Sequence, residues 1–196
     1  MNSRDSVLGA VRRHQPSSVP LPDLDGPWIT YADPVAQFAA TLEMIGGRCV
    51  RVPTIDAAQA DLVQQQCYQS ARKIVSAVAG LGQANVRMES ARDPHELQDV
   101  DLAILPGEFG VAENGAVWVT DAGVPHRVIY FLCQHLVLVL PGDAVVHNMH
   151  QVYERVRFPA AGFGTFLSGP SKTADIEQSL VIGAHGPKST TVYLVG

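Results

Sequence analysis

Charged residues are scarce in this 196-residue chain. They make up 17% of it, whereas a typical globular domain has about 25%. The 19 Asp and Glu residues outnumber the 14 Lys and Arg residues, for a net charge of −5. The basic residues are scattered rather than gathered into a stripe, so the sequence lacks the positive surface of a nucleic-acid-binding protein. We expect no nucleic-acid partner.

Cysteine is also scarce, and long apolar runs are absent. Cys49, Cys67 and Cys133 form no CxxC pair, zinc-knuckle spacing or ferredoxin-type run, so we expect no metal and no iron–sulfur cluster in this chain. An odd cysteine count without a disulfide framework is typical of a reducing compartment. The longest apolar run, residues 128–140, is shorter than the ~20 residues of a membrane-spanning helix, and no apolar leader follows Met1. We expect a cytoplasmic protein without a membrane partner.

What the chain does contain is enough apolar sequence for one domain with an appendage. Apolar residues make up 46% of it, sufficient for a core without disulfides. Five of the 13 prolines fall between residues 16 and 34. We therefore divide the chain into residues 1–33, a short helix and an extended arm (residues 15–33), and a domain over residues 34–196. Trp28 and Tyr31 are candidate anchors for the arm; the alternative is a partly disordered tail. An anchored arm would either cover its own sheet or exchange between two copies in a homodimer.

The remaining pattern predicts alternating helices and strands. Asp33 and Pro34 begin a helix that Gly46 and Gly47 end. Continuous rather than alternating hydrophobicity predicts strands covered on both faces, as in a mostly parallel α/β sheet. Strands are expected at 48–52, 101–105, 116–120, 136–140, 165–167 and 190–195, and helices at 34–45, 56–66, 147–157 and from Thr173.

The most informative stretch, residues 168–177 (the signature segment), reads Ser-Gly-Pro-Ser-Lys-Thr-Ala-Asp-Ile-Glu. The pattern predicts a strand, a turn and the start of a helix. Free N–H groups there, with the charge of Lys172 and the hydroxyls of Ser168, Ser171 and Thr173, would bind a phosphate or carboxylate. Asp175 is a candidate acid or base. The alternative is purely structural: a hydroxyl caps the helix and the acidic residues offset its dipole.

Two further glycine-rich stretches contain candidate catalytic residues. Glu113 lies in residues 107–115 between two predicted strands; buried there, its carboxylate would have a perturbed pKa and could act as nucleophile or base. Alternatively, Asn114-Gly115 is a hairpin turn and Glu113 flanks it on the surface. His185, in residues 183–187 (the histidine loop), is a candidate for acid–base work or anion binding. His147 and His150 lack a third clustered metal ligand.

Several of these sequence motifs resemble the motifs of a known protein family. Residues 168–177 resemble the SGPS(R/K)TADIE signature of the LUD domain, specifically of the small lactate-utilisation protein C (YkgG) family, and residues 183–187 resemble its G-x-HGP. Residues 111–115 resemble its (I/V)AETG turn, with Asn114 where the family has Thr, and His135 resembles its histidine before an apolar strand. Nearly all of the likeness lies in residues 101–196.

The resemblance implies a three-layer α/β/α fold like that of ribose-5-phosphate isomerase, glucosamine-6-phosphate deaminase and coenzyme A transferases. It also implies a role in oxidising L-lactate to pyruvate together with two iron–sulfur proteins (LutA-like and LutB-like), which would carry the clusters. Glu113-Asn114-Gly115 further resembles the Glu-Asn-Gly of coenzyme A transferases, in which the Glu accepts the acyl group.

The leading hypothesis is therefore a cytoplasmic accessory protein of lactate oxidation that binds a small anionic metabolite. Because ligands of α/β sheets bind beyond the carboxyl ends of strands, we expect the pocket there. Catalytic roles fall to Glu113, His185 and Asp175. The ligand contacts are expected from Ser168, Gly169, Pro170, Ser171, Lys172, Thr173 and Gly186. Two alternatives remain: an enzyme like the coenzyme A transferases or sugar-phosphate isomerases that uses Glu113, and a non-catalytic scaffold.

Overall fold

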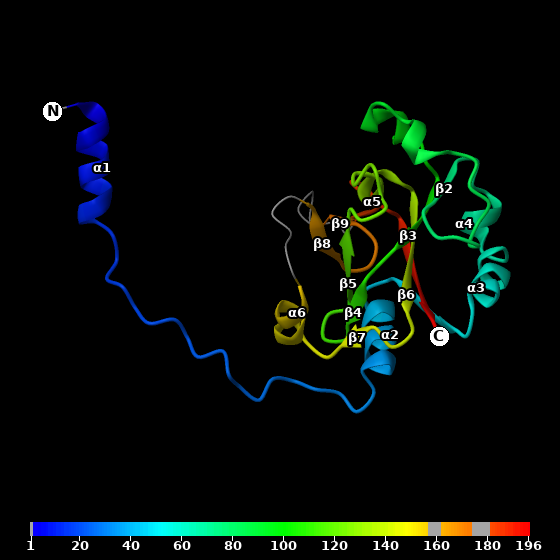
Figure 1. Ribbon diagram of the computed structural model, residues 1–196, viewed down its shortest axis with the longest axis horizontal. Coiled ribbons are helices and arrows are strands. Elements are labelled where there is room, and N and C mark those ends of the chain that lie inside the picture. The colour runs from blue at the N-terminus through cyan, green and yellow to red at the C-terminus, as the bar shows by residue number, and fades with distance from the viewer. Residues whose placement is uncertain (1, 157–161, 174–180) are drawn as a thin grey trace.

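Two sheets and their covering helices form the body of the protein in the computed structural model, which describes residues 2–156, 162–173 and 181–196 (Figure 1). The helices are α1 (Ser3–Arg13), α2 (Pro34–Met44), α3 (Ile55–Leu62), α4 (Gln66–Gln69), α5 (Ile129–Leu132) and α6 (Met149–Arg155), with short 3₁₀ turns at Met88–Ser90 and Pro94–Leu97. The strands are β1 (Arg48–Val52), β2 (Ile74–Ser76), β3 (Leu102–Pro106), β4 (Phe109–Val111), β5 (Ala116–Thr120), β6 (His135–Pro141), β7 (Val145–Val146), β8 (Gly164–Leu167), β9 (Lys172–Thr173), β10 (Val181–Ile182) and β11 (Ser189–Val195).

The central sheet has five parallel strands in the order β1-β11-β6-β3-β2. Alternate residues of these strands face opposite sides and both sides are buried: Val137 and Tyr193 pack against α3, whereas Leu138 and Val192 pack toward α2 and α5. This two-sided burial explains the continuous apolar runs in the sequence. A parallel sheet flanked by helices confirms the predicted α/β class.

A second sheet, in the order β7-β4-β5-β8, covers part of one face of the central sheet. Its β4–β5 and β5–β8 pairs are antiparallel. The run at 116–120 is therefore a strand, as predicted, but it does not belong to the parallel sheet. Its apolar pattern is continuous because its outer face is also covered: Trp118 packs in a cluster with Val152 of α6.

The helix boundaries follow their predicted caps where the structure describes them. Asp33 accepts a hydrogen bond from the Ala36 N–H and Pro34 occupies the first turn of α2. Gly46 ends that helix with a φ of +88°, which only glycine adopts readily. The helix predicted at 56–66 is confirmed as far as Leu62, where α3 ends, and α4 begins only at Gln66.

The prediction that a helix begins at Thr173 is wrong. Thr173 does not begin a helix: with Lys172 it forms β9, which pairs antiparallel with Val181 and Ile182 of β10. The β-branched side chains of Thr173, Val181 and Ile182 favour an extended backbone over a first helical turn. Residues 174–180, which include Asp175, lie outside the described residues.

The arm runs along the body only near its end. Trp28 stacks on His150 of α6, with ring centroids 3.5 Å apart, and the Tyr31 N–H donates to His147 Nδ1. The predicted anchors are therefore confirmed, whereas the boundary at residue 33 stays a prediction. Before residue 24 the arm leaves the body, and α1 lies well apart from it (Figure 1). No helix in the described parts of the chain is long and apolar enough to span a bilayer.

Candidate functional site

The signature segment and the histidine loop lie side by side. The Ser171 N–H donates to the Pro187 carbonyl, and the Gly183 N–H donates to the Ser171 carbonyl, both at 2.9 Å. Gly186 is so close that a Cβ placed on it would lie 3.0 Å from Ser171 Cβ and 3.3 Å from Ser171 Oγ. These contacts bring the two predicted binding motifs into one site.

The turn that ends α2 completes one wall of this site. A Cβ on Gly46 would lie 3.7 Å from Pro170 Cγ and 4.0 Å from the Lys172 ammonium. Gly169, with a φ of +70°, packs against Ile45 of the same turn. Sequence reasoning identified Gly46 only as a helix stop. Its contact with the signature segment could not have been found, because no pattern links two glycine turns more than 120 residues apart.

The site lies at the amino-terminal edge of the parallel sheet. His135 and Ser189, the first residues of β6 and β11, are register partners, so the histidine loop that precedes β11 reaches the same edge as Gln134. The Lys188 N–H donates to the Gln134 carbonyl at 2.7 Å. The expected position beyond the carboxyl ends is therefore wrong. The signature segment follows β8, a strand of the second sheet, and the histidine loop precedes β11. Neither motif therefore follows the carboxyl end of a strand in the parallel sheet.

The described part of this site carries positive charge. The described segments 168–173 and 181–188 contain Lys172, Lys188 and His185 but no acidic residue. Lys172, Lys188 and His185 are exposed. In the part of the chain that the structure describes, no carboxylate pairs with Lys172. The side chains can therefore offer two ammonium groups and an imidazole to an anion.

His135 lies at the start of β6, next to the histidine loop. Its Nδ1 lies 2.7 Å from Ser189 Oγ, and both side chains are partly buried. Burial lowers the His135 pKa from its ordinary value, and the nearby Lys188 charge lowers it further. The neutral imidazole is thus favoured at neutral pH, and its hydrogen bond to Ser189 joins β6 to β11.

Glu113 lies in a hairpin turn between β4 and β5 and is exposed. Of the two alternatives, the hairpin turn is confirmed: Gly115, with a φ of +66°, closes the turn, and Glu113 flanks it on the surface. The carboxylate accepts a 2.9 Å hydrogen bond from the Met149 N–H, the first of α6. The turn does touch the signature segment, since the Ser168 hydroxyl donates to the Asn114 carbonyl at 2.8 Å.

Histidines 147 and 150 have partners other than a metal. Nδ1 of His147 accepts from Tyr31, and the His150 ring stacks on Trp28. Among the described residues, no group of three His, Cys, Asp or Glu side chains is placed to hold a metal ion. Both imidazoles fix the arm on α6.

Comparison with known proteins links this site to a family. A family model described as the LUD domain matches residues 59–195. Lactate utilization protein C of Shouchella clausii is 31% identical over 113 residues, which cover 55% of this chain and 49% of that protein. The uncharacterized protein YkgG of Escherichia coli K12 is 27% identical over 115 residues, covering 55% and 48%. The match thus spans about half the length of these curated relatives.

A solved structure supports the fold. The crystal structure of a DUF162 family protein from Deinococcus radiodurans superposes with a TM-score of 0.58 and 19% identity. The superposition covers 83% of this chain and 96% of that one. At this identity the likeness establishes the fold alone.

Proposed function

This chain belongs to the LUD domain family, and we propose that it takes part in lactate utilization by binding a small organic anion at the amino-terminal edge of its parallel sheet. The observation that carries the proposal is the joined pair of loops: Ser171 exchanges backbone hydrogen bonds with Pro187 and Gly183. The names of the relatives that match support the metabolic context.

The chemistry of the site fits a carboxylate ligand. Lys172 and Lys188 supply positive charge, and the Ser171 hydroxyl lies beside Gly186, where the absence of a side chain lets the two loops pack closely. Charge-assisted hydrogen bonds from ammonium groups to carboxylates are among the stronger polar contacts in proteins. L-Lactate and pyruvate are both small carboxylates.

Within this proposal, His185 exchanges protons with the ligand and Lys172 holds its carboxylate. Asp175 belongs to the same proposal from its place in the signature segment alone, since it lies outside the described residues. Electron transfer is assigned to iron–sulfur partner proteins, because this chain has three separated cysteines. Glu113 remains a candidate proton carrier, although its described hydrogen bond is to α6.

The test is thermal unfolding of the purified chain with L-lactate, pyruvate and, as a control anion, chloride at equal ionic strength. A ligand at 100 times its dissociation constant stabilises a protein by about 2.7 kcal/mol, which is measurable as a rise in Tm. We expect lactate or pyruvate to raise Tm, and Lys172→Ala to abolish the rise.

The matched control is Lys73→Ala, which removes the same charge from a lysine paired with Asp99 on another part of the surface. Lys73→Ala should keep the ligand-induced rise. If the two carboxylates leave Tm unchanged, or if both lysine variants lose the rise equally, the proposed anion site is refuted.

A further inference from the structure

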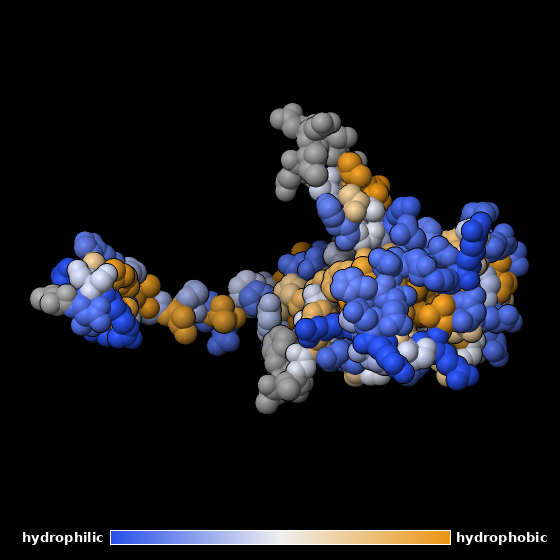
Figure 2. Space-filling model, turned by 90° about the horizontal axis from the view of Figure 1, so that it is seen from above, coloured by the Kyte–Doolittle hydropathy of each residue, from blue (hydrophilic) through white to orange (hydrophobic). Residues whose placement is uncertain are grey.

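Helix α1 exposes an apolar face that no described residue of its own molecule covers. Val7 and Val11 are 59% and 55% exposed, Leu8 lies beside them and is 37% exposed, and no residue of the helix is buried. In Figure 2, α1 and the beginning of the arm extend away from the body. An isolated helix of 11 residues is only marginally stable in water, so α1 requires a surface to pack against.

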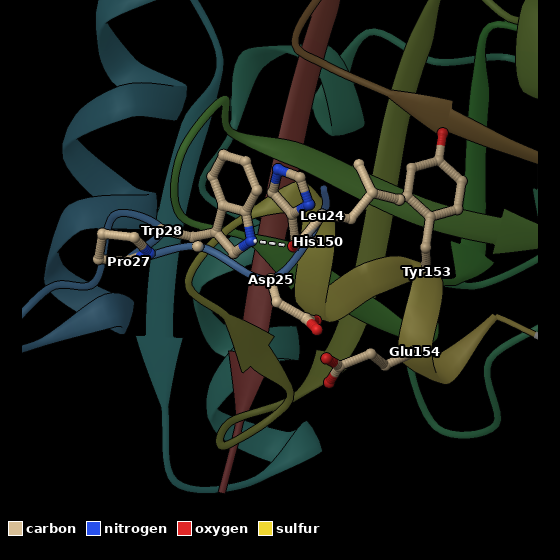
Figure 3. A pocket seen from close by; sticks show the side chains of 8 residues that line it. Leu24, Asp25, Pro27, Trp28, His150, Tyr153 and Glu154 are labelled. Atoms are coloured by element: carbon tan, nitrogen blue, oxygen red, sulfur yellow. Dashed lines mark hydrogen bonds between the residues drawn. The ribbon is translucent and has the colours of Figure 1, made fainter. Parts of the chain in front are cut away.

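A groove of matching character lies where the arm meets α6. Residues 24–28 of the arm form one wall, and His150, Tyr153 and Glu154 of α6 form the other (the α6 groove), enclosing about 930 Å³. Figure 3 shows the Trp28 and His150 rings stacked on one side and Tyr153 on the other. The arm wall is held by a hydrogen bond from Trp28 Nε1 to the Leu24 carbonyl and by the stack itself.

The charges of the helix and the groove are complementary. α1 carries Arg4, Arg12 and Arg13 against a single acidic residue. The groove carries Asp25 and Glu154, whose carboxylates point toward each other in Figure 3, and the described residues that line it include no lysine or arginine. An amphipathic helix that lays its apolar side chains into a groove rimmed by opposite charge is a common mode of recognition.

The arm directs α1 away from its own groove. Residues 14–23 separate the end of α1 from Leu24, and Pro16, Pro20 and Pro22 hold this stretch extended. At about 3.1 Å per residue, such a spacer carries α1 roughly 30 Å away. An extended spacer of this length suits the groove of a neighbouring molecule rather than a reversal onto its own.

We propose that α1 of one molecule packs into the α6 groove of a second copy of this chain, and that the exchange is reciprocal in a two-fold dimer. This inference is independent of the proposed anion site. It concerns the arm and α6, whereas the anion site is formed by the signature segment and the histidine loop.

The first experiment measures the mass of the full chain in solution over a range of concentrations, by light scattering after size exclusion. We expect a dimer whose dissociation constant rises about tenfold or more in Leu8→Asp. Ser6→Asp introduces the same charge on the opposite side of α1, about 200° around the helix, and should leave the dimer unchanged. In the groove, Tyr153→Asp should weaken the dimer, whereas Met44→Asp, at an exposed residue that does not line the groove, should not.

The second experiment mixes the two weakened variants. Leu8→Asp keeps an intact groove and Tyr153→Asp keeps an intact α1, so a mixture restores one of the two contacts and should form a heterodimer. A wild-type chain that stays monomeric, a dimer that neither variant weakens, or a mixture that stays monomeric would each overturn the proposal. A monomer in which Leu8→Asp alters Trp28 fluorescence would instead assign the groove to the molecule's own α1.

Discussion

A hydrogen-bond cluster joining β1, β11 and α3 holds the amino-terminal edge of the sheet and can be tested quantitatively. Asp61 accepts hydrogen bonds from both terminal guanidinium nitrogens of Arg48 at 2.7 Å and from the Tyr193 hydroxyl at 2.6 Å. The Gln65 amide donates to the Tyr193 oxygen and to Asp61. Arg48 begins β1 directly after Gly46 and Gly47, so this cluster also fixes the turn that contacts the signature segment.

The perturbation is Asp61→Ala. Tyr193 is fully buried, and its hydroxyl would lose its charged acceptor. A hydrogen bond to a charged group contributes about 1.5–3 kcal/mol. The Arg48 and Asp61 side chains are 45% and 29% exposed, so their ion pair adds at most about 1 kcal/mol. We expect the free energy of unfolding to fall by roughly 2–4 kcal/mol.

The assay is urea unfolding at pH 7 of the wild type, Asp61→Ala, Tyr193→Phe and the double variant. Tyr193→Phe removes the hydrogen bond donated to Asp61 and the one accepted from Gln65, but leaves the carboxylate paired with Arg48, so we expect a loss of about 1–3 kcal/mol. Because the two residues touch, the double variant should lose about 1 kcal/mol less than the two single losses combined. A loss below about 0.5 kcal/mol for Asp61→Ala, or strict additivity, would refute the reasoning.

The same cluster predicts a pH dependence. The hydrogen bonds from Arg48 hold the Asp61 pKa well below its usual range. A carboxyl whose pKa is lower in the folded state stabilises the protein above the unfolded pKa of about 3.9, and this contribution is lost as the pH falls through the folded pKa. The stability difference between wild type and Asp61→Ala should therefore be smaller at pH 3 than at pH 7.

Three further perturbations test other parts of the structure. Burial lowers the His135 pKa, so unfolding takes up a proton and stability should fall as pH drops from about 7 to 5.5; His135→Gln should flatten that slope in urea titrations. Gly164→Ala would place a Cβ 2.3 Å from the Trp118 ring and should cost about 1–3 kcal/mol, measurable by thermal unfolding. Glu113→Ala should cost about 1 kcal/mol through the lost contact with α6, while the ligand-induced rise in Tm persists. A lost rise would favour a proton-carrying role for Glu113.

Local signals in the sequence were sufficient for most elements of the fold. The Asp33-Pro34 start and the Gly46 stop act within a few residues, so they predict α2 without knowledge of the rest of the fold. The apolar run of β6 predicts a strand because both of its faces are covered, whichever elements cover them. The assignment of 116–120 to the parallel sheet failed because apolar periodicity reports burial but not the direction of the neighbouring strand.

The sequence predicted that two of the motifs meet, but not where in the fold they do so. Ser171 and the histidine loop do meet, and this was expected from their chemistry. Their position at the amino-terminal edge depends on which strand follows each loop, and the sequence alone does not order the strands. The turn after α2, Ile45-Gly46-Gly47, lies close to Lys172 but has no polar side chain that would indicate a binding site.

Because Lys172 and Thr173 form a strand and not the start of a helix, an anion at this site would be held by side-chain charges and not by a helix end. A helix beginning at Thr173 would have offered fixed N–H groups and its dipole, whereas the described geometry leaves the exposed ammonium groups of Lys172 and Lys188. The attraction between exposed charges is screened over about 10 Å at 0.1 M salt and about 3 Å at 1 M. The dissociation constant for lactate, measured by calorimetry, should therefore rise severalfold between these concentrations. An unchanged constant would mean that fixed backbone groups, rather than the two lysines, hold the ligand.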